Sequence, residues 1–132
     1  MIQVILTRGL PGSGKSTWAK KLISDNPNKF KRINKDDLRA MLDNDKWSND
    51  SEKFILDVRD MLILKAIENG KHVIVDDTNF APKHVQRIEQ LIKGKAELKI
   101  QDFTIVPLQT CIDRDLERNK SVGEKVIRKM HN

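Results

Sequence analysis

The stretch Gly9-Leu-Pro-Gly-Ser-Gly-Lys-Ser-Thr17 decides the fold of this chain, because it fits the phosphate-binding pattern G-x-x-x-x-G-K-[ST] without a mismatch. An apolar run at residues 2–7 precedes it, and a helical pattern begins at Lys15. A glycine-rich loop between a strand and a helix surrounds the phosphates of a nucleoside triphosphate with backbone N–H groups. The sequence therefore predicts a nucleotide site beyond the end of the first strand.

The residue types in this loop suit the chemistry of phosphate binding. Glycines let the backbone approach an anion without a side-chain clash, and the following helix directs its positive end at that anion. We expect Lys15 to reach the β- and γ-phosphates, the Ser16 hydroxyl to bind Mg²⁺ and Thr17 to reach the α-phosphate. A turn without a ligand is the alternative, and the strand-to-helix context argues against it. The predicted nucleotide contacts are Gly9, Pro11, Gly12, Ser13, Gly14, Lys15, Ser16 and Thr17.

Apolar runs alternate with helical patterns along the chain. Strands separated by helices form a parallel sheet with right-handed crossovers. We therefore predict a three-layer α/β fold of the P-loop NTPase type, with helices flanking the sheet. One domain is expected over residues 1–132, with residues 108–132 as a lid. The predicted strands are 2–7, 30–34, 71–75 and 98–106, and the predicted helices are 15–23, 36–42, 51–69, 108–118 and 123–130, with a further helix from Pro82.

The longest predicted helix, residues 51–69, carries two local expectations. Ser51 is placed to cap its first turn, and Gly70 is placed to end it. The residues that recur at helical spacing, and that we expect on one face, are Phe54, Ile55, Val58, Met61, Leu62, Lys65 and Ala66.

The composition and charge of the chain indicate which partners it can bind. Its net charge is +6, and residues 19–39 hold seven cations against three anions, a balance that favours a polyanion such as nucleic acid. A solvated surface is the open alternative. Cys111 is the only cysteine, so no internal disulfide forms, and a small buried role is expected for it. No apolar stretch approaches about 18 residues and no signal-peptide pattern is present, so we expect a cytoplasmic protein that binds no membrane.

Acidic and basic side chains follow the second and third predicted strands, where ligands bind on parallel sheets. Asp36 is placed to accept the proton of an acceptor hydroxyl, and Arg39 lies three residues later on the same helix face. Acids that merely begin a helix are the alternative. After the buried strand, Asp76 or Asp77 is placed to contact Mg²⁺ through water or to position Arg39, with a polar turn as the alternative.

The C-terminal helices carry several cations. A lid over the phosphates needs one or two arginines to neutralise charge in the transition state of phosphoryl transfer. Arg118 is favoured because it lies near the turn at residues 119–123, although any single cation here is also consistent with a solvated residue. The cations are Arg114, Arg118, Lys120, Lys125, Arg128 and Lys129.

Taken in order, these motifs resemble a known family. Gly-x-Pro-Gly-Ser-Gly-Lys-Ser-Thr-Trp-Ala, Asn-Pro, Ile-Asn-x-Asp-Asp-x-Arg, Asp-Thr-Asn and Glu-Arg-Asn together are similar to the kinase domain of bacteriophage T4-type polynucleotide kinase. The resemblance implies an adenylate-kinase-like fold and transfer of the ATP γ-phosphate to a 5′-hydroxyl of DNA or RNA. It implies Lys15 and Ser16 at the triphosphate and Mg²⁺, Asp36 as general base and Arg39 on the acceptor. Asp77 would support the substrate site, and Arg118 would act from the lid on nucleotide and reaction.

Two departures from the family pattern stand out. The family's second lid arginine falls at Val122 here, so Arg128, Lys120 or Lys125 is left to substitute for it, or the lid works with one arginine. No chain remains for the 3′-phosphatase domain of the T4-type enzyme, so we expect a fragment or a minimal kinase. A phage-encoded chain would act in the cytoplasm of its bacterial host.

Two other functions stay open at the level of sequence. The same Asp and Arg would serve a P-loop kinase for a small alcohol, such as a sugar, nucleoside or metabolite. A nucleotide-binding module with a weak active site is the other, because of Val122. The choice between DNA and RNA depends on contacts to the 2′-hydroxyl, which the sequence does not place.

Overall fold

Four parallel strands form one sheet in the order β2-β3-β1-β4. The computed structural model describes residues 1–118 and 122–131. The strands are β1 (Gln3–Arg8), β2 (Phe30–Ile33), β3 (His72–Val75) and β4 (Glu97–Asp102). The helices are α1 (Lys15–Asp25), α2 (Lys35–Asp43), α3 (Asn49–Glu68), α4 (Pro82–Ile92), α5 (Leu108–Leu116) and α6 (Glu124–His131).

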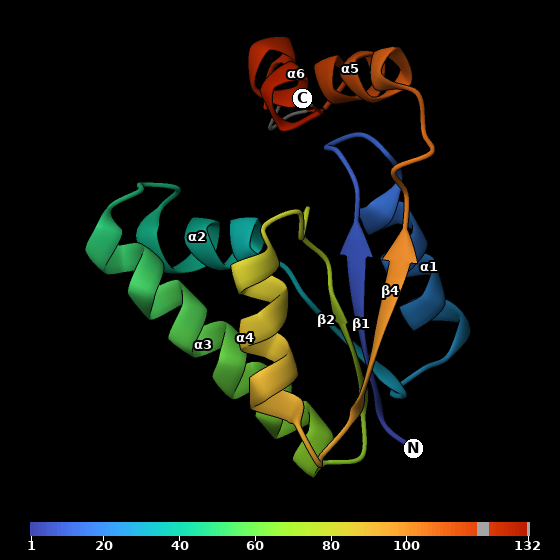
Figure 1. The fold of residues 1–132 in the computed structure, drawn as a ribbon, viewed down its shortest axis with the longest axis vertical. Coiled ribbons are helices and arrows are strands. Elements are labelled where there is room, and N and C mark those ends of the chain that lie inside the picture. Colours follow the sequence, from blue (N-terminus) through green and yellow to red (C-terminus); the bar gives the residue numbers. More distant parts are fainter. Residues whose placement is uncertain (119–121, 132) are drawn as a thin grey trace.

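The two central strands, β1 and β3, are buried on both faces. Val4 and Leu6 of β1 and all of Val73–Val75 in β3 are fully buried, as continuous apolar runs in parallel sheets are. Helices α3 and α4 lie to one side of the sheet and α1 to the other (Figure 1). The main core fills the space between the sheet and the first of these layers. The predicted three-layer α/β fold is confirmed.

The edge strand β4 is shorter than predicted. It ends at Asp102 instead of continuing to Val106, because the Asp102 carboxylate accepts a hydrogen bond from the Thr104 N–H (2.7 Å) and turns the chain. The Val106 N–H then bonds back to the Phe103 carbonyl oxygen (3.2 Å). This turn directs the chain into α5 above the sheet.

Helix α3 buries only part of the predicted set. Ile55 and Ala66 face the core as predicted, together with Ile63, whereas Phe54 and Met61 are 58% and 69% exposed. Apolar residues cover more than one side of this helix, so spacing alone did not choose the buried side.

The N-terminal cap of α3 also differs from the expectation. Ser48, not Ser51, caps the helix. Ser51 occupies the third helical position and completes a capping box with Ser48.

Helices α5 and α6 pack against each other beyond the carboxyl ends of the strands (Figure 1). They enclose a second small core of Leu10, Cys111, Ile112 and Ile127, so Cys111 is buried as predicted. Because Leu10 belongs to the phosphate loop, this core seats the two helices on that loop. In residues 1–118 and 122–131, none of the helices combines the length and the hydropathy of a membrane-spanning segment.

Candidate active site

The phosphate loop connects β1 to α1 at the point where the strand order changes direction, which is where α/β sheets bind ligands. Gly12 and Gly14 have φ angles of 82° and 100°, a left-handed conformation that other residues rarely adopt. A Cβ atom on Gly12 would lie 2.3 Å from the Cys111 carbonyl oxygen, so only glycine fits beneath α5. Gly14 precedes the first residue of α1, so the positive end of that helix faces the loop.

Lys15 is 8% exposed and turns back onto its own loop. Its Nζ donates to the carbonyl oxygens of Gly9 (2.8 Å) and Leu10 (2.7 Å). The pKa of Lys15 is lowered from 10.5 to about 8, chiefly by burial, with the Asp76 carboxylate opposing the shift and the Arg118 charge adding to it. A triphosphate bound in the loop would place negative charge next to the Lys15 ammonium.

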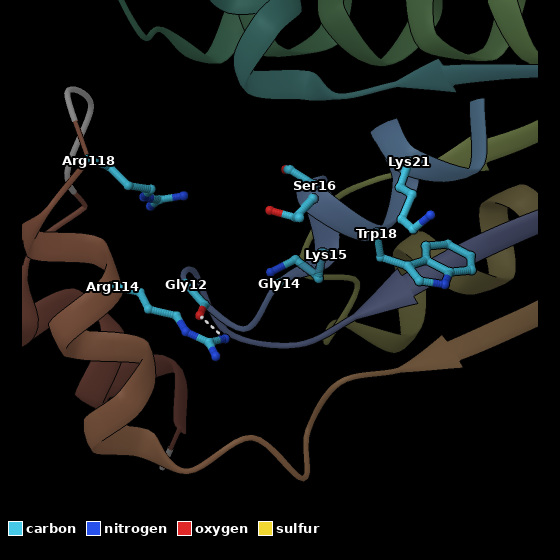
Figure 2. Close-up of a pocket in the computed structure, with 9 residues that line it drawn as sticks. Gly12, Gly14, Lys15, Ser16, Trp18, Lys21, Arg114 and Arg118 are labelled. Atoms are coloured by element: carbon cyan, nitrogen blue, oxygen red, sulfur yellow. Dashed lines mark hydrogen bonds between the residues drawn. The ribbon is translucent and has the colours of Figure 1, made fainter. Parts of the chain in front are cut away.

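A cavity of about 560 Å³ lies between the phosphate loop and α5. Figure 2 shows Arg114 and Arg118 on one side of it and Lys15 and Ser16 on the other. Thr17, Trp18 and Lys21 of α1 also line this cavity. Its size suits a nucleotide.

Two arginines, four residues apart, face this cavity from the end of α5. Arg114 Nη1 donates to the Gly12 carbonyl oxygen (3.3 Å), as the dashed line in Figure 2 marks. Arg118 pairs with the fully buried Asp115, which also accepts the Val122 N–H (3.0 Å). The sequence favours Arg118 over its neighbours and offers Arg128, Lys120 or Lys125 as a second cation, but not Arg114. The i,i+4 spacing with Arg114 was the signal that could have identified the pair.

The other candidates for a second lid arginine lie elsewhere. The Val122 side chain packs into the small core under the lid. Arg128 pairs with Glu124 on the exposed side of α6, and Lys125 on the same helix is exposed. Lys120 lies outside the described residues. Arg114 is thus the residue that joins Arg118 at the cavity.

A group of oxygen atoms suited to Mg²⁺ lies at the start of α1. The Ser16 hydroxyl donates to Asp76 Oδ2 (2.8 Å), and Asp76 is buried at the end of β3. A hydroxyl and a carboxylate are the hard oxygen ligands that Mg²⁺ prefers, so the residues fit the ion. Arg32 of β2 shares the site, because its Nε donates to the same Asp76 oxygen (2.6 Å). Sequence reasoning missed Arg32, whose role arises from the pairing of β2 with β3.

The two acids after β3 take different places. Asp76 lies beside Ser16, whereas Asp77 lies beside α2 and accepts the Lys35 backbone N–H (3.1 Å). Burial raises the pKa of the Asp77 carboxyl, and the nearby Lys35 charge opposes that shift. Among the described residues Asp77 forms no hydrogen bond or ion pair with Arg39, and its bond is to the backbone at the start of α2.

Asp36 and Arg39 lie on the first turns of α2, just beyond the carboxyl end of β2. Arg39 Nη1 donates to Asp36 Oδ1 (2.6 Å), and the Asp36 side chain is 78% exposed. Arg39 also forms two bonds to Glu52 of α3, from Nε (2.7 Å) and Nη2 (2.6 Å). The hydrogen bond from Arg39 lowers the pKa of Glu52, which therefore stays charged. Nothing local in the sequence indicated Glu52, because the pairing joins two helices.

One further cation is buried in the core. Arg59 of α3 is fully buried and donates to Asp60 Oδ1 from Nε (3.1 Å) and Nη2 (3.0 Å). Asp60 in turn pairs with Arg87 of α4. Within residues 1–118 and 122–131, Arg59 Nη1 has no hydrogen-bond partner. The sequence did not identify this charge as buried.

The fold and the phosphate loop together define a class, the P-loop kinase-type α/β domains. The family model AAA_33, described as an AAA domain, matches residues 4–132, and the chain belongs to that family. Membership in this class implies a nucleoside triphosphate as ligand, typically ATP with Mg²⁺.

Two curated relatives match most of this chain. The L-seryl-tRNA(Sec) kinase of Methanococcus maripaludis is 29% identical over 97% of the chain and 51% of its own length. A protein of Autographa californica nuclear polyhedrosis virus, provisionally named a bifunctional polynucleotide kinase/RNA ligase, is 27% identical over 89% of the chain and 18% of its own length. The chain thus spans about half, or less, of the relatives it matches.

Solved structures agree with these relatives. A chain in the structure of the Pnkp1/Rnl/Hen1 RNA repair complex is 26% identical, with a TM-score of 0.85 over 98% of this chain and 43% of that one. The APS kinase CysC of Mycobacterium tuberculosis has a TM-score of 0.68 over 88% of this chain and 69% of its own, and at 22% identity it shows the fold alone. The resemblance to a polynucleotide-kinase-type kinase domain is confirmed.

Proposed function

We propose that this chain transfers the γ-phosphate of ATP to the 5′-hydroxyl of a polynucleotide. The observation that carries the proposal is the exposed Asp36 carboxylate, held by Arg39 at the same edge of the sheet as the phosphate loop. A general base must be accessible to its substrate and keep a fixed orientation, and the exposure of Asp36 and its pairing with Arg39 support that role. The relatives support the acceptor class, since their names concern tRNA, polynucleotides and RNA repair.

The phosphate loop and lid have distinct tasks in this reaction. Lys15 leaves the carbonyl oxygens of its loop and binds the β- and γ-phosphates. Ser16 and Asp76 would hold Mg²⁺, which neutralises charge on the phosphate oxygens when bound. Arg114 and Arg118 then face the moving phosphoryl group from the lid and stabilise its developing charge.

The chemical step is an in-line displacement. Asp36 accepts the proton of the 5′-hydroxyl as that oxygen bonds to the γ-phosphorus. The bond from the γ-phosphorus to the β–γ bridging oxygen breaks, and ADP leaves with the electron pair. Arg39, fixed by Glu52, keeps Asp36 oriented and lies beside the acceptor.

A second candidate acceptor is a hydroxyl on an aminoacyl-tRNA. It is favoured by the 29% identity to L-seryl-tRNA(Sec) kinase over 97% of this chain. The catalytic roles are unchanged, and only the group beyond Asp36 differs. A small free alcohol has weaker support, because the match to APS kinase shows the fold alone.

The test is transfer of labelled γ-phosphate from ATP with Mg²⁺ to separate acceptors: 5′-hydroxyl RNA, 5′-hydroxyl DNA, seryl-tRNA, nucleosides and glucose. We expect label on the oligonucleotides. Label on seryl-tRNA alone would assign the second candidate, and label on a free alcohol alone would refute a polynucleotide acceptor. ATP binding without transfer to any acceptor would indicate a nucleotide-binding module.

A substitution assigns the base within the same assay. Asp36→Asn should lower kcat by about 10²- to 10⁴-fold while leaving the KM for ATP unchanged. Asp57→Asn is the matched control, because Asp57 is 73% exposed and also pairs with an arginine, Arg87, away from the cavity. Equal activity of the two variants would remove Asp36 from the proposed role.

A further inference from the structure

Trp47 is a large aromatic side chain that the fold leaves 65% exposed. It lies in the connection between α2 and α3, one residue before Ser48, the N-cap of α3. Exposing an indole to water forgoes the favourable transfer of its apolar surface. Its place in the connection that follows α2, the helix that carries Asp36 and Arg39, makes it a candidate binding surface.

The exposure of Trp47 has a local cause. A residue just before an N-cap usually packs against an apolar residue at the fourth helical position. In α3 that position is Glu52, so no apolar partner covers the ring. The Trp47 side chain instead lies near the Glu52 carboxylate, where it is a minor contributor to the lowered pKa of that group. Most of the Trp47 side chain stays exposed.

The backbone on both sides of Trp47 is also held. The Asp45 N–H bonds to the Arg39 carbonyl oxygen (3.1 Å), and the Lys46 N–H bonds to the Asp43 carbonyl oxygen (3.0 Å). On the other side, the capping box of α3 begins at the next residue. An aromatic residue with a fixed backbone loses less conformational freedom when a ligand stacks on its ring.

Glu52 relates Trp47 to the acceptor side of the site. The same Glu52 carboxylate holds Arg39 through two hydrogen bonds of 2.7 and 2.6 Å, and Arg39 holds Asp36 at 2.6 Å. Trp47 is thus separated from the candidate base by two side chains. Trp47 and the candidate base therefore belong to the same group of neighbouring side chains on α2 and α3.

The chemistry around the ring favours a neutral, flat ligand. The exposed charges that flank Trp47 in the chain are mixed, with Lys46 beside it and Asp45 and Asp50 further away, so they do not form a basic patch for phosphate groups. A nucleobase has an uncharged π-face, and stacking on an aromatic ring is the usual way proteins hold unpaired bases.

We propose that Trp47 is the stacking platform for the base of the 5′-terminal nucleotide of the acceptor. This inference rests on the proposed function and adds a substrate requirement to it. The acceptor end must be single-stranded, or must open, so that its first base leaves the helix and meets the indole.

The experiment compares two 5′-hydroxyl oligonucleotides that differ only at the first nucleotide, one with its base and one abasic. Trp47→Ala should raise the KM of the base-bearing strand about tenfold or more, the range expected for one stacked base, with kcat little changed. It should leave the KM of the abasic strand unchanged. Trp47→Phe keeps a ring face and should retain most of the affinity.

Two controls separate stacking from other effects. Phe54→Ala removes another exposed aromatic of α3, two residues beyond Glu52 and therefore on the opposite side of the helix, and should change neither KM. For the base-bearing strand, the ratio of the KM of Trp47→Ala to the KM of the wild-type protein should be the same at low and high salt, because stacking releases no counterions. Equal KM values for wild type and Trp47→Ala on the base-bearing strand would overturn the inference, and would leave the ring to a protein partner.

A binding measurement keeps the two proposals distinguishable. Trp18→Phe leaves Trp47 as the only tryptophan, since the chain has two. The base-bearing strand should quench its fluorescence and the abasic strand should not. Transfer to oligonucleotides without this quenching refutes the stacking role alone. Absence of transfer refutes the proposed function. In that case the quenching alone tests whether Trp47 stacks on the terminal base.

Discussion

The titration of Lys15 leads to a quantitative prediction about nucleotide binding. Burial sets the pKa of this ammonium at about 8 in the free protein. A triphosphate favours the charged form and raises the pKa in the complex. ATP binding must therefore take up protons. If the pKa of Lys15 in the complex lies well above 9, the uptake is about 0.1 proton per site at pH 7, about 0.5 at pH 8 and about 0.9 at pH 9. The same linkage weakens the apparent Kd about tenfold between pH 7 and pH 9.

The assay is isothermal titration calorimetry of a non-hydrolysable ATP analogue with Mg²⁺, in buffers of different ionisation enthalpy. The slope of the observed enthalpy against buffer enthalpy counts the protons. Lys15→Arg is the control, because a guanidinium stays protonated over this range and removes the lysine contribution. Equal proton uptake by wild type and Lys15→Arg at pH 8.5 would refute the reasoning.

The same shift affects folding, with a definite sign. The pKa of Lys15 is lower in the folded chain (about 8) than its ordinary value of 10.5, so the unfolded chain binds more protons between these values. Stability should therefore rise as pH increases from about 8 to about 10.5, by up to about 3 kcal/mol from this group. Urea unfolding should show that this slope is smaller in Lys15→Met.

Two other predictions concern the lid and the loop beneath it. Arg114→Ala and Arg118→Ala should each lower kcat by about 10²-fold or more, because each removes a cation that stabilises the transition state. Arg128→Ala, on the outside of α6, should leave kcat unchanged. An unchanged kcat in Arg114→Ala would mean that the lid works with one arginine. Gly12→Ala places a Cβ 2.3 Å from the Cys111 carbonyl oxygen at positive φ, so urea unfolding should show a loss above about 2 kcal/mol; Gly70→Ala, with positive φ and open space around it, should lose only about 1 kcal/mol.

Local and periodic features were predictable from the sequence. The phosphate loop lies within nine consecutive residues, and its backbone geometry depends on glycines at set positions. The strands β1 and β3 were found because buried parallel strands are continuous apolar runs. These signals also indicated the α/β class, since alternating strands and helices permit few topologies.

Contacts between distant segments determined the parts of the candidate site that the sequence did not predict. Asp76 and Asp77 are neighbours in sequence, yet the alternation of side chains at the end of β3 sends one to Ser16 and the other to Lys35. Glu52 became part of the site only because α3 packs beside α2.

The amino-acid sequence by itself determined the phosphate loop, the parallel α/β fold and the candidate residues on α2, because each is encoded in local spacing. Only the tertiary structure decided that Arg114 joins Arg118, that Glu52 holds Arg39 and that Trp47 stays exposed. Each of these depends on which faces of two helices meet, and that choice is made by the packing of the whole chain.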